Sequence, residues 1–374
     1  MRTAVALLCA TAVAIFPTSP AHADQARDNQ WHLRYLQVNK AHDISRGAGV
    51  TVAVIDTGVD PHPDLHKNLL EGTDSFPGGT GDGQVDDDGH GTRMAGLIAA
   101  HGRPGNRGAL GIAPDAKILP IRYVKTTGSN DPDDVATGIN WAVGKGAKVI
   151  SISSTTSSTP ALRQAVTAAL SANVVIVAGA GNRSGGILVR FPAAFQGVVA
   201  VAATDRNGSH SSISVTGSKI VISAPGEDIS STSPGGRYRT ASGTSPSTAI
   251  VAGAAALVRS KFPELSAEEV IHRLTATADD KGAPGRDEEY GYGVLNLVKA
   301  LTADVPPLEG GAETSASADP SPTQSQPAAG AEPEDKSNSS TVLIGVLAAL
   351  VVVGLLVVLA VVLLARRRQQ PRSS

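Results

Sequence analysis

Runs of apolar, mostly β-branched residues recur along the chain with room for helices between them. They cover residues 50–55, 116–122, 148–152, 174–178, 198–202 and 219–223, and helix-forming stretches lie at 133–145 and 160–172. A strand that helices cover on both faces is apolar along its whole length, so this pattern predicts an α/β domain with a mainly parallel sheet. We expect the chemistry at the carboxyl ends of these strands and in the adjoining loops.

Three candidate catalytic residues follow one another in the order Asp, His, Ser. Asp56 ends the first apolar run, His90 lies between two glycines, and Ser245 follows Gly-Thr just ahead of an Ala-rich helical stretch at 248–258. This is one of the chain orders in which a serine-hydrolase triad occurs. The three residues together therefore predict a serine hydrolase.

The local sequence around each candidate suits its expected role. A carboxylate at the buried end of a strand is costly without a partner, and the ring N–H of His90 would partner Asp56 and fix the histidine tautomer. Pro246 favours the first turn of a helix, where the backbone N–H of Ser245 could stabilise an oxyanion. Each residue taken alone also has a structural explanation: a turn cap for Asp56, a packing role for His90 and an N-cap for Ser245.

A fourth candidate, Asn182, follows the apolar run at 174–178. It ends the small-residue sequence Ala-Gly-Ala-Gly-Asn. The side-chain amide of such a residue can donate a hydrogen bond to an oxyanion, although Gly-Asn by itself is more often a turn. We therefore expect Asn182 in the oxyanion hole.

The two ends of the chain predict an exported, membrane-anchored protein. Residues 1–23 combine Arg2, a short apolar run and a small-residue cleavage site, as a signal peptide does. Residues 304–341 are rich in Pro, Ala and Ser, as in a flexible stalk. Residues 342–365 carry no charged or polar side chain, and at ~1.5 Å per residue they can cross a core of ~30 Å. The Arg-rich residues 366–374 would stay in the cytoplasm, with residues 24–303 as the extracytoplasmic domain.

Charge and cysteine content restrict the partners. Of the 32 Lys and Arg residues, five lie in the two terminal segments, so 27 face 34 acidic residues in the exported part, a balance of −7. This balance argues against nucleic-acid binding. Cys9, the chain's single cysteine, lies in the predicted signal peptide, so the mature protein would have no disulfide. We expect no cofactor; the acidic stretch 82–88 is either a solvated loop leading to His90 or a structural calcium loop.

The predicted exported domain resembles the subtilisin-like serine peptidases over nearly its whole length. The matching stretches are Val-Ala-Val-Ile-Asp-Thr-Gly-Val at 52–59, His-Gly-Thr at 90–92, Gly-Asn at 181–182 and Gly-Thr-Ser at 243–245. With its signal peptide, Pro-rich stalk and C-terminal span, the chain resembles in particular the mycosins, membrane-anchored subtilases associated with type VII secretion.

The resemblance implies a three-layer fold with a mainly parallel seven-stranded sheet, plus one C-terminal transmembrane helix. It implies peptide-bond hydrolysis by Asp56, His90 and Ser245, with Asn182 in the oxyanion hole. It also implies that substrate binds as an added strand, between Gly128 and Ser129 on one side and Ser153, Ser154 and Thr155 on the other. Broadly tolerant subtilisins usually have glycines where Thr155 and Thr156 stand, so we expect a small residue before the scissile bond.

The chain departs from the family pattern in three ways. Pro246 directly follows the candidate nucleophile, where the family usually has a small or aromatic residue and its proline two or three positions later. Many mycosins carry disulfides, and the mature part here has no cysteine. Residues 24–43 are too few for a folding pro-domain, so we expect them to pack on the catalytic domain, with Trp31 and Leu33 as anchors.

The sequence thus predicts a membrane-anchored extracytoplasmic serine endopeptidase that acts on protein or peptide substrates. Its link to type VII secretion membrane components follows from the mycosin resemblance. The alternative is a structural component of a secretion complex, in which the protease activity is dispensable or absent. The complete set of four candidate residues favours the enzyme, and Pro246 keeps the alternative open.

Overall fold

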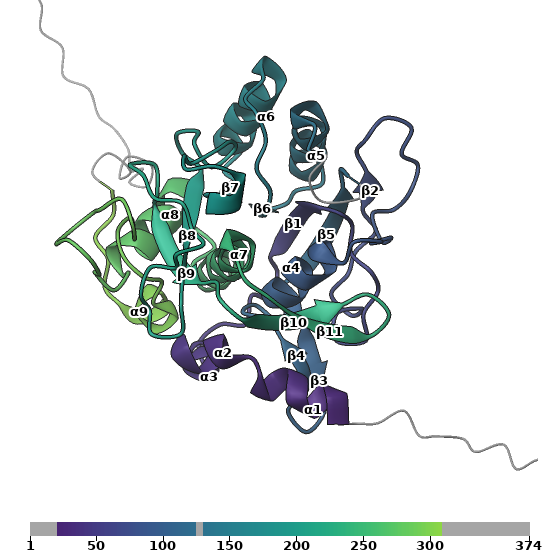
Figure 1. Ribbon diagram of the computed structural model, residues 1–374, viewed down its shortest axis with the longest axis horizontal. Helices are drawn as coiled ribbons and strands as arrows, with labels where there is room; N and C mark the ends of the chain where they lie inside the picture. The colour runs from purple at the N-terminus through teal and green to yellow at the C-terminus, as the bar shows by residue number, and fades with distance from the viewer. Residues whose placement is uncertain (1–20, 125–129, 309–374) are drawn as a thin grey trace, which may run out of the picture. The chain divides into compact units, whose positions relative to one another are not determined.

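The computed structural model describes residues 21–124 and 130–308 (Figure 1). Several predictions lie outside the described residues: most of the signal peptide, the stalk from residue 309 onward, the membrane span 342–365, the tail 366–374, and the substrate-binding residues Gly128 and Ser129. Among the helices of the described ranges, none has both the length and the apolar character needed to cross a membrane.

The described secondary structure alternates strands and helices. The helices are α1 (Ala21–Asp28), α2 (Trp31–Tyr35), α3 (Val38–His42), α4 (His90–Ala99), α5 (Pro132–Gly144), α6 (Pro160–Ser171), α7 (Thr244–Lys261), α8 (Ala267–Ala276) and α9 (Leu297–Thr302), with a short 3₁₀ turn at Arg183–Gly185. The strands are β1 (Thr51–Asp56), β2 (Thr73–Asp74), β3 (His101–Arg103), β4 (Arg107–Leu110), β5 (Lys117–Arg122), β6 (Val149–Ile152), β7 (Val175–Gly179), β8 (Val199–Thr204), β9 (Ile222–Pro225), β10 (Ile229–Ser233) and β11 (Arg237–Ala241).

The predicted parallel sheet is confirmed. It has seven strands in the order β2-β5-β1-β6-β7-β8-β9, and its paired neighbours are all parallel. After β5 the chain crosses β1 and continues on its other side with β6, so the strand order reverses beside β1. Such a reversal leaves a crevice at the carboxyl ends of the strands, where open α/β sheets bind their ligands. Asp56 is the last residue of β1 and therefore lies at this edge.

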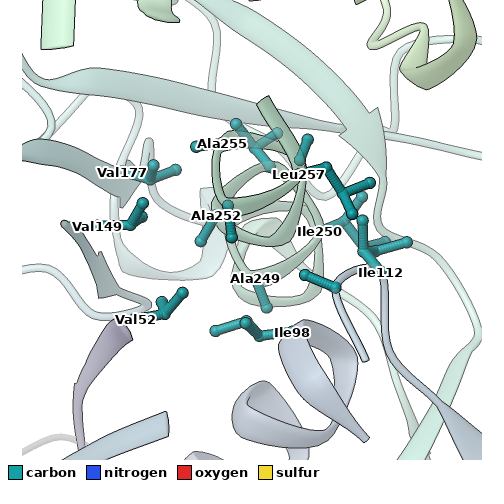
Figure 2. Close-up of a cluster of buried hydrophobic side chains, with 14 of the residues drawn as sticks. Val52, Ile98, Ile112, Val149, Val177, Ala249, Ile250, Ala252, Ala255 and Leu257 are labelled. Carbon is teal, nitrogen blue, oxygen red and sulfur yellow. The ribbon is translucent and has the colours of Figure 1, made fainter. Parts of the chain in front are cut away.

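Helices cover both faces of the sheet, as the apolar strands predict. Alternate residues of β1 enter different cores: Val52 and Val54 join the core of α4 and α7, whereas Ala53 and Ile55 join that of α5 and α6. Figure 1 shows α5 and α6 above the strands and α4 and α7 below them. In Figure 2, small residues of α7 face valines from the neighbouring strands, which lets this buried helix lie close to the sheet.

Two elements have a boundary more than two residues from the sequence-based expectation. The strand predicted at 219–223 begins only at Ile222 and ends at Pro225. The helix predicted at 248–258 begins at Thr244, with Gly243 as its N-cap, and ends at Lys261. Pro246 therefore lies inside the first turn, where the missing N–H has no intrahelical acceptor to lose.

The N-terminal helices pack against the rest of the domain: α1 contacts β4 and β10, and α3 contacts α9 (Figure 1). The buried amide of Gln30 donates to the Leu110 carbonyl over 3.0 Å and accepts from the Leu110 N–H over 2.8 Å. The Trp31 indole is buried and donates to the Glu227 carbonyl over 3.1 Å, whereas Leu33 is only partly buried. Gln30 and Trp31 thus provide buried polar contacts of this segment with the domain, and Arg27 and His42 add further hydrogen bonds to main-chain carbonyls.

Candidate active site

Asp56 and His90 form a short, buried hydrogen-bonded pair. His90 is the first residue of α4, and its Nδ1 lies 2.7 Å from Oδ1 and 3.0 Å from Oδ2 of Asp56. The Asp56 side chain is only 3% exposed, and the Thr57 N–H also donates to its Oδ1 over 2.8 Å. A carboxylate held in this way keeps the proton of neutral His90 on Nδ1, which leaves Nε2 free to accept a proton.

The pair also changes the acidity of the histidine. Burial lowers the pKa of His90, but the charge of Asp56 and its hydrogen bond outweigh burial and raise the pKa above the ordinary 6.5. A general base with a raised pKa binds a proton more tightly, and it needs a higher pH than an ordinary histidine to be deprotonated.

A second carboxylate, Asp86, holds the first turn of α4, the helix that begins with His90. It is 6% exposed and accepts four hydrogen bonds, from the Thr57 hydroxyl (2.7 Å), the Gly89 N–H (2.7 Å), the Thr92 N–H (2.8 Å) and the Thr92 hydroxyl (2.6 Å). The Thr57 hydroxyl in turn accepts from the Gly91 N–H over 3.0 Å. Asp86 therefore joins the end of β1 to the first turn of α4, the two elements that carry Asp56 and His90.

The sequence analysis did not single out Asp86. The available signal was an Asp ahead of a helix start, since carboxylates accept hydrogen bonds from the free N–H groups of a first helical turn. Burial raises the pKa of Asp86, and the four donated hydrogen bonds oppose this shift. The contacts agree with the view that the acidic loop leads into the His90 helix.

The same contacts argue against a calcium ion at Asp86. Its oxygens already accept four protein hydrogen bonds, so they are not free to coordinate a cation. Asp87 turns away to Arg122, with 2.9 Å between carboxylate and guanidinium. Within residues 21–124 and 130–308, no group of three or more His, Cys, Asp or Glu side chains is arranged to hold a metal. The contacts of Asp86 and Asp87 favour the loop that leads to His90 over the calcium alternative for this stretch.

Ser245 lies in the first turn of α7, and its hydroxyl hydrogen bonds to a main-chain carbonyl of the cavity wall. Its Oγ donates to the main-chain carbonyl of Ser153, just after β6, over 2.9 Å. The Ser153 hydroxyl donates back to the Ser245 carbonyl over 3.2 Å. Because the Ser245 hydroxyl donates to this carbonyl, its proton must leave that hydrogen bond before it can pass to His90 Nε2.

The amide of Asn182 is oriented by the residue before Ser245. Its Oδ1 accepts the Thr244 N–H over 2.9 Å, which leaves Nδ2 as the donor end. Gly243 allows this approach: its φ is +148°, and a Cβ there would lie 2.9 Å from Asn182 Nδ2. Thr244 thus fixes the amide orientation that the predicted oxyanion-hole role of Asn182 requires.

A cavity of about 420 Å³ brings these residues together. It is lined by His90, Ser245 and Asn182, by Ser153, Ser154 and Thr155 as expected for substrate-binding residues, and by parts of the segment 179–190. Thr156 does not line it, because this side chain is buried and donates to the Asn130 carbonyl over 2.8 Å. Of the two threonines expected to narrow the substrate pocket, only Thr155 faces the cavity.

Comparison with known proteins gives a consistent result. The model of the Subtilase family matches residues 47–293. The thermostable alkaline protease of Halalkalibacterium halodurans is 39% identical over 272 residues, which are 72% of this chain and 73% of that protein. Subtilisin Savinase of Lederbergia lenta is 38% identical over 279 residues, which are 74% of this chain and 99% of that protein.

The similar solved structures include two mycosin proteases. MycP1 with its N-terminal propeptide removed is 33% identical, and the match has a TM-score of 0.67 and covers 74% of this chain and 98% of MycP1. The MycP3 protease from the type VII (ESX-3) secretion system is 36% identical, with a TM-score of 0.64 and coverage of 77% of this chain and 90% of MycP3.

Proposed function

We propose, from the premise that this chain belongs to the Subtilase family, that Asp56, His90 and Ser245 are its catalytic triad and Asn182 its oxyanion donor. The chain is a subtilisin-like serine endopeptidase that resembles the mycosins, and its substrates are proteins or peptides. The observation that carries the assignment is the Asp56–His90 hydrogen bond beside a cavity that Ser245 and Asn182 also line.

In the proposed mechanism, the Ser245 hydroxyl attacks the substrate carbonyl and passes its proton to His90 Nε2. The imidazolium that forms is stabilised by Asp56 and then protonates the leaving amine. A water molecule then attacks the acyl-enzyme and passes a proton to His90, which returns a proton to Ser245 as the peptide acid leaves. The negative charge on the tetrahedral intermediate would be stabilised by Asn182 Nδ2 and the backbone N–H of Ser245.

The tether between Ser245 and the Ser153 carbonyl suggests how substrate activates the site. A peptide that binds as an added strand along residues 153–155 offers its own N–H groups to carbonyls of that segment. A substrate N–H that takes the Ser153 carbonyl would release the Ser245 hydroxyl to His90. Ser245 would then form its hydrogen bond with His90 only when substrate binds, whereas Asp56 and His90 are in position beforehand.

We further propose that the enzyme is anchored in the cell membrane by residues 342–365, with its catalytic domain outside, and that it works with a type VII secretion system. The support is the apolar segment itself and the mycosin neighbours, one of which is described as part of the ESX-3 system. The competing proposal is a structural component whose protease activity is dispensable, and Pro246 is the feature that favours it.

One experiment separates the two proposals. Wild type and Ser245→Ala are compared for labelling by a fluorophosphonate probe and for restoring secretion in a strain that lacks the gene. We expect labelling of wild type alone and no restoration by the alanine variant. Labelling of neither protein would contradict the triad, and full restoration by Ser245→Ala would support the structural role.

A further inference from the structure

The charged groups that line the active-site cavity are of one sign. Besides His90, the charged residues in its lining are Arg93 and Arg190, and the described lining residues include no Asp or Glu. The cavity is therefore positive although the chain as a whole is slightly acidic, with 34 acidic and 32 basic residues. A cleft with one sign of charge attracts ligands of the opposite sign.

Arg190 faces this cavity because its neighbours in sequence face the core. Residues 189–191 run beside the segment at Thr156 in an extended conformation, with an antiparallel bridge between Thr156 and Phe191. Val189 and Phe191 pack against the hydrophobic core. Since side chains of an extended segment alternate between its two faces, Arg190 points to the other side, toward the cavity and solvent.

The guanidinium of Arg190 has no partner within the described part of the protein. The hydrogen bonds of Arg190 there are both main-chain: its N–H donates to the Ala180 carbonyl over 3.3 Å, and its carbonyl accepts from the Ala194 N–H over 2.9 Å. Arg93 differs, because its side chain is 15% exposed and its guanidinium lies 3.9 Å from the Asp88 carboxylate. Arg190 is thus the cation of the cavity that is free to bind a ligand.

We propose that Arg190 selects substrates with an acidic side chain, glutamate above all, at the residue before the scissile bond. This inference rests on the proposed function, because that residue is defined by the attack of Ser245 on its carbonyl. Its side chain would enter the cavity between residues 153–155 and 179–181, whose walls lead to Arg190. A carboxylate there would form a charge-assisted hydrogen bond with the guanidinium.

The shape of the cavity favours glutamate over bulky apolar residues. The Thr155 methyl group approaches to 3.5 Å from where a side chain on Gly181 would begin, so it narrows the space between the two walls. β-Branched side chains are stiff and do not move aside easily. An unbranched side chain such as that of glutamate can pass this point, whereas branched or aromatic side chains meet it. Glutamate replaces the small residue that the sequence predicts at this position, and we expect poor cleavage after Phe and Leu.

Two peptides that differ only in Glu or Gln before the scissile bond isolate the effect of charge. We expect kcat/KM of the wild type to be about 10- to 100-fold higher for the Glu peptide, the range for a hydrogen bond to a charged group. The ratio should approach one in Arg190→Gln and should decrease with added salt, because Arg190 is exposed. In Arg190→Glu, a Lys peptide should become preferred over its Gln counterpart.

The matched control is Arg163→Gln on α6, whose guanidinium lies over the Phe195 ring outside the cavity and whose loss should leave the ratio unchanged. A ratio near one in wild type, or an unchanged ratio in Arg190→Gln, would overturn the inference. Calorimetric binding of both peptides to Ser245→Ala gives the same comparison without catalysis. Glu-selective binding without turnover would contradict the proposed enzyme alone, and turnover without Glu selectivity would contradict Arg190 alone.

Discussion

The active site has two sides: Asp56 and His90 form a preformed side that buried hydrogen bonds hold in place, whereas Ser245, Asn182 and the cleft beyond them form an open side that faces solvent. On the first side, Asp86 and Thr57 connect β1 to α4 through short buried hydrogen bonds. On the second side, the Ser245 hydroxyl is bound to a carbonyl of the cleft wall, and Leu188 at the rim is 72% exposed. The difference suggests that the protein builds the acid–base pair in advance and leaves the nucleophile to be completed by substrate.

The largest expected losses of kcat come from substitution of the triad residues themselves, which lie on both sides of the site. Ser245→Ala and His90→Ala should each lower kcat by roughly 10⁶, and the double variant should lose little more, because the residues act as a unit. Asp56→Asn should lower kcat by about 10⁴, since the wrong histidine tautomer is favoured. Active-site-titrated peptide hydrolysis measures all of them. If the loss in the double variant equalled the product of the two single losses, Ser245 and His90 would not act in the same step.

Asn182 tests the open side. Asn182→Ala should lower kcat by about 10² to 10³ with little change in KM, because the lost hydrogen bond forms only in the transition state. Gly243→Ala should have a similar effect indirectly, because its Cβ would displace the Asn182 amide. A rise in KM of similar size, with kcat unchanged, would instead show that Asn182 binds the substrate equally in the ground state and the transition state.

Asp86 tests the preformed side. Asp86→Ala leaves the Gly89 and Thr92 N–H groups without their acceptor, so we expect the free energy of unfolding to fall by about 3 kcal/mol. The remaining folded enzyme should show a lower kcat, because the first turn of α4 also carries His90. Asp82→Ala, in the exposed part of the same loop, is the control and should change neither quantity. Urea unfolding and peptide hydrolysis provide the two readouts, and equal effects of both variants would count against the positioning role.

The pH dependence provides the smallest effect. Because Asp56 raises the pKa of His90, the acid limb of the kcat/KM profile should lie above 6.5, with activity increasing as His90 loses its proton. The charged pair should stabilise the fold below the unfolded pKa of histidine, and this contribution should disappear as the pH rises through the His90 pKa. Wild type should therefore exceed Asp56→Asn in melting temperature by more in acid than in alkali. An acid limb below 6.5 would contradict the shift.

The sequence predicted the elements whose residues repeat regularly. The strands β1, β5, β6, β7 and β8 of the central sheet and the helices α5 and α6 were found close to their expected bounds, because burial on both faces leaves a continuous apolar pattern. The short strand β2 (Thr73–Asp74) and the hairpin of β10 with β11 were missed, since two residues carry no period and the residues of β11 are polar and largely exposed.

At the site, too, the sequence predicted what local patterns encode and missed what depends on contacts between distant segments. The residue types and order predicted several residues of the cavity lining and the Asp56–His90 hydrogen bond, but not the other hydrogen bonds of the site. The role of Asp86 depends on bringing residues 57, 86 and 92 together, which no local pattern encodes. The position of the Ser245 hydroxyl depends on a rotamer and on a carbonyl 92 positions away in sequence. Arg190 was missed because one arginine in a loop looks like any solvated charge until the cavity is known.

The most direct test of the contrast between the two sides is the titration of His90 by ¹⁵N NMR in the substrate-free protein. If Asp56 and His90 are preformed and Ser245 is bound elsewhere, wild type and Ser245→Ala should show the same His90 pKa and the same Nδ1–H signal. Asp56→Asn should lose that signal and lower the pKa. A marked change of the His90 pKa or ring shifts in Ser245→Ala would show that the serine already binds the histidine, and would contradict the account.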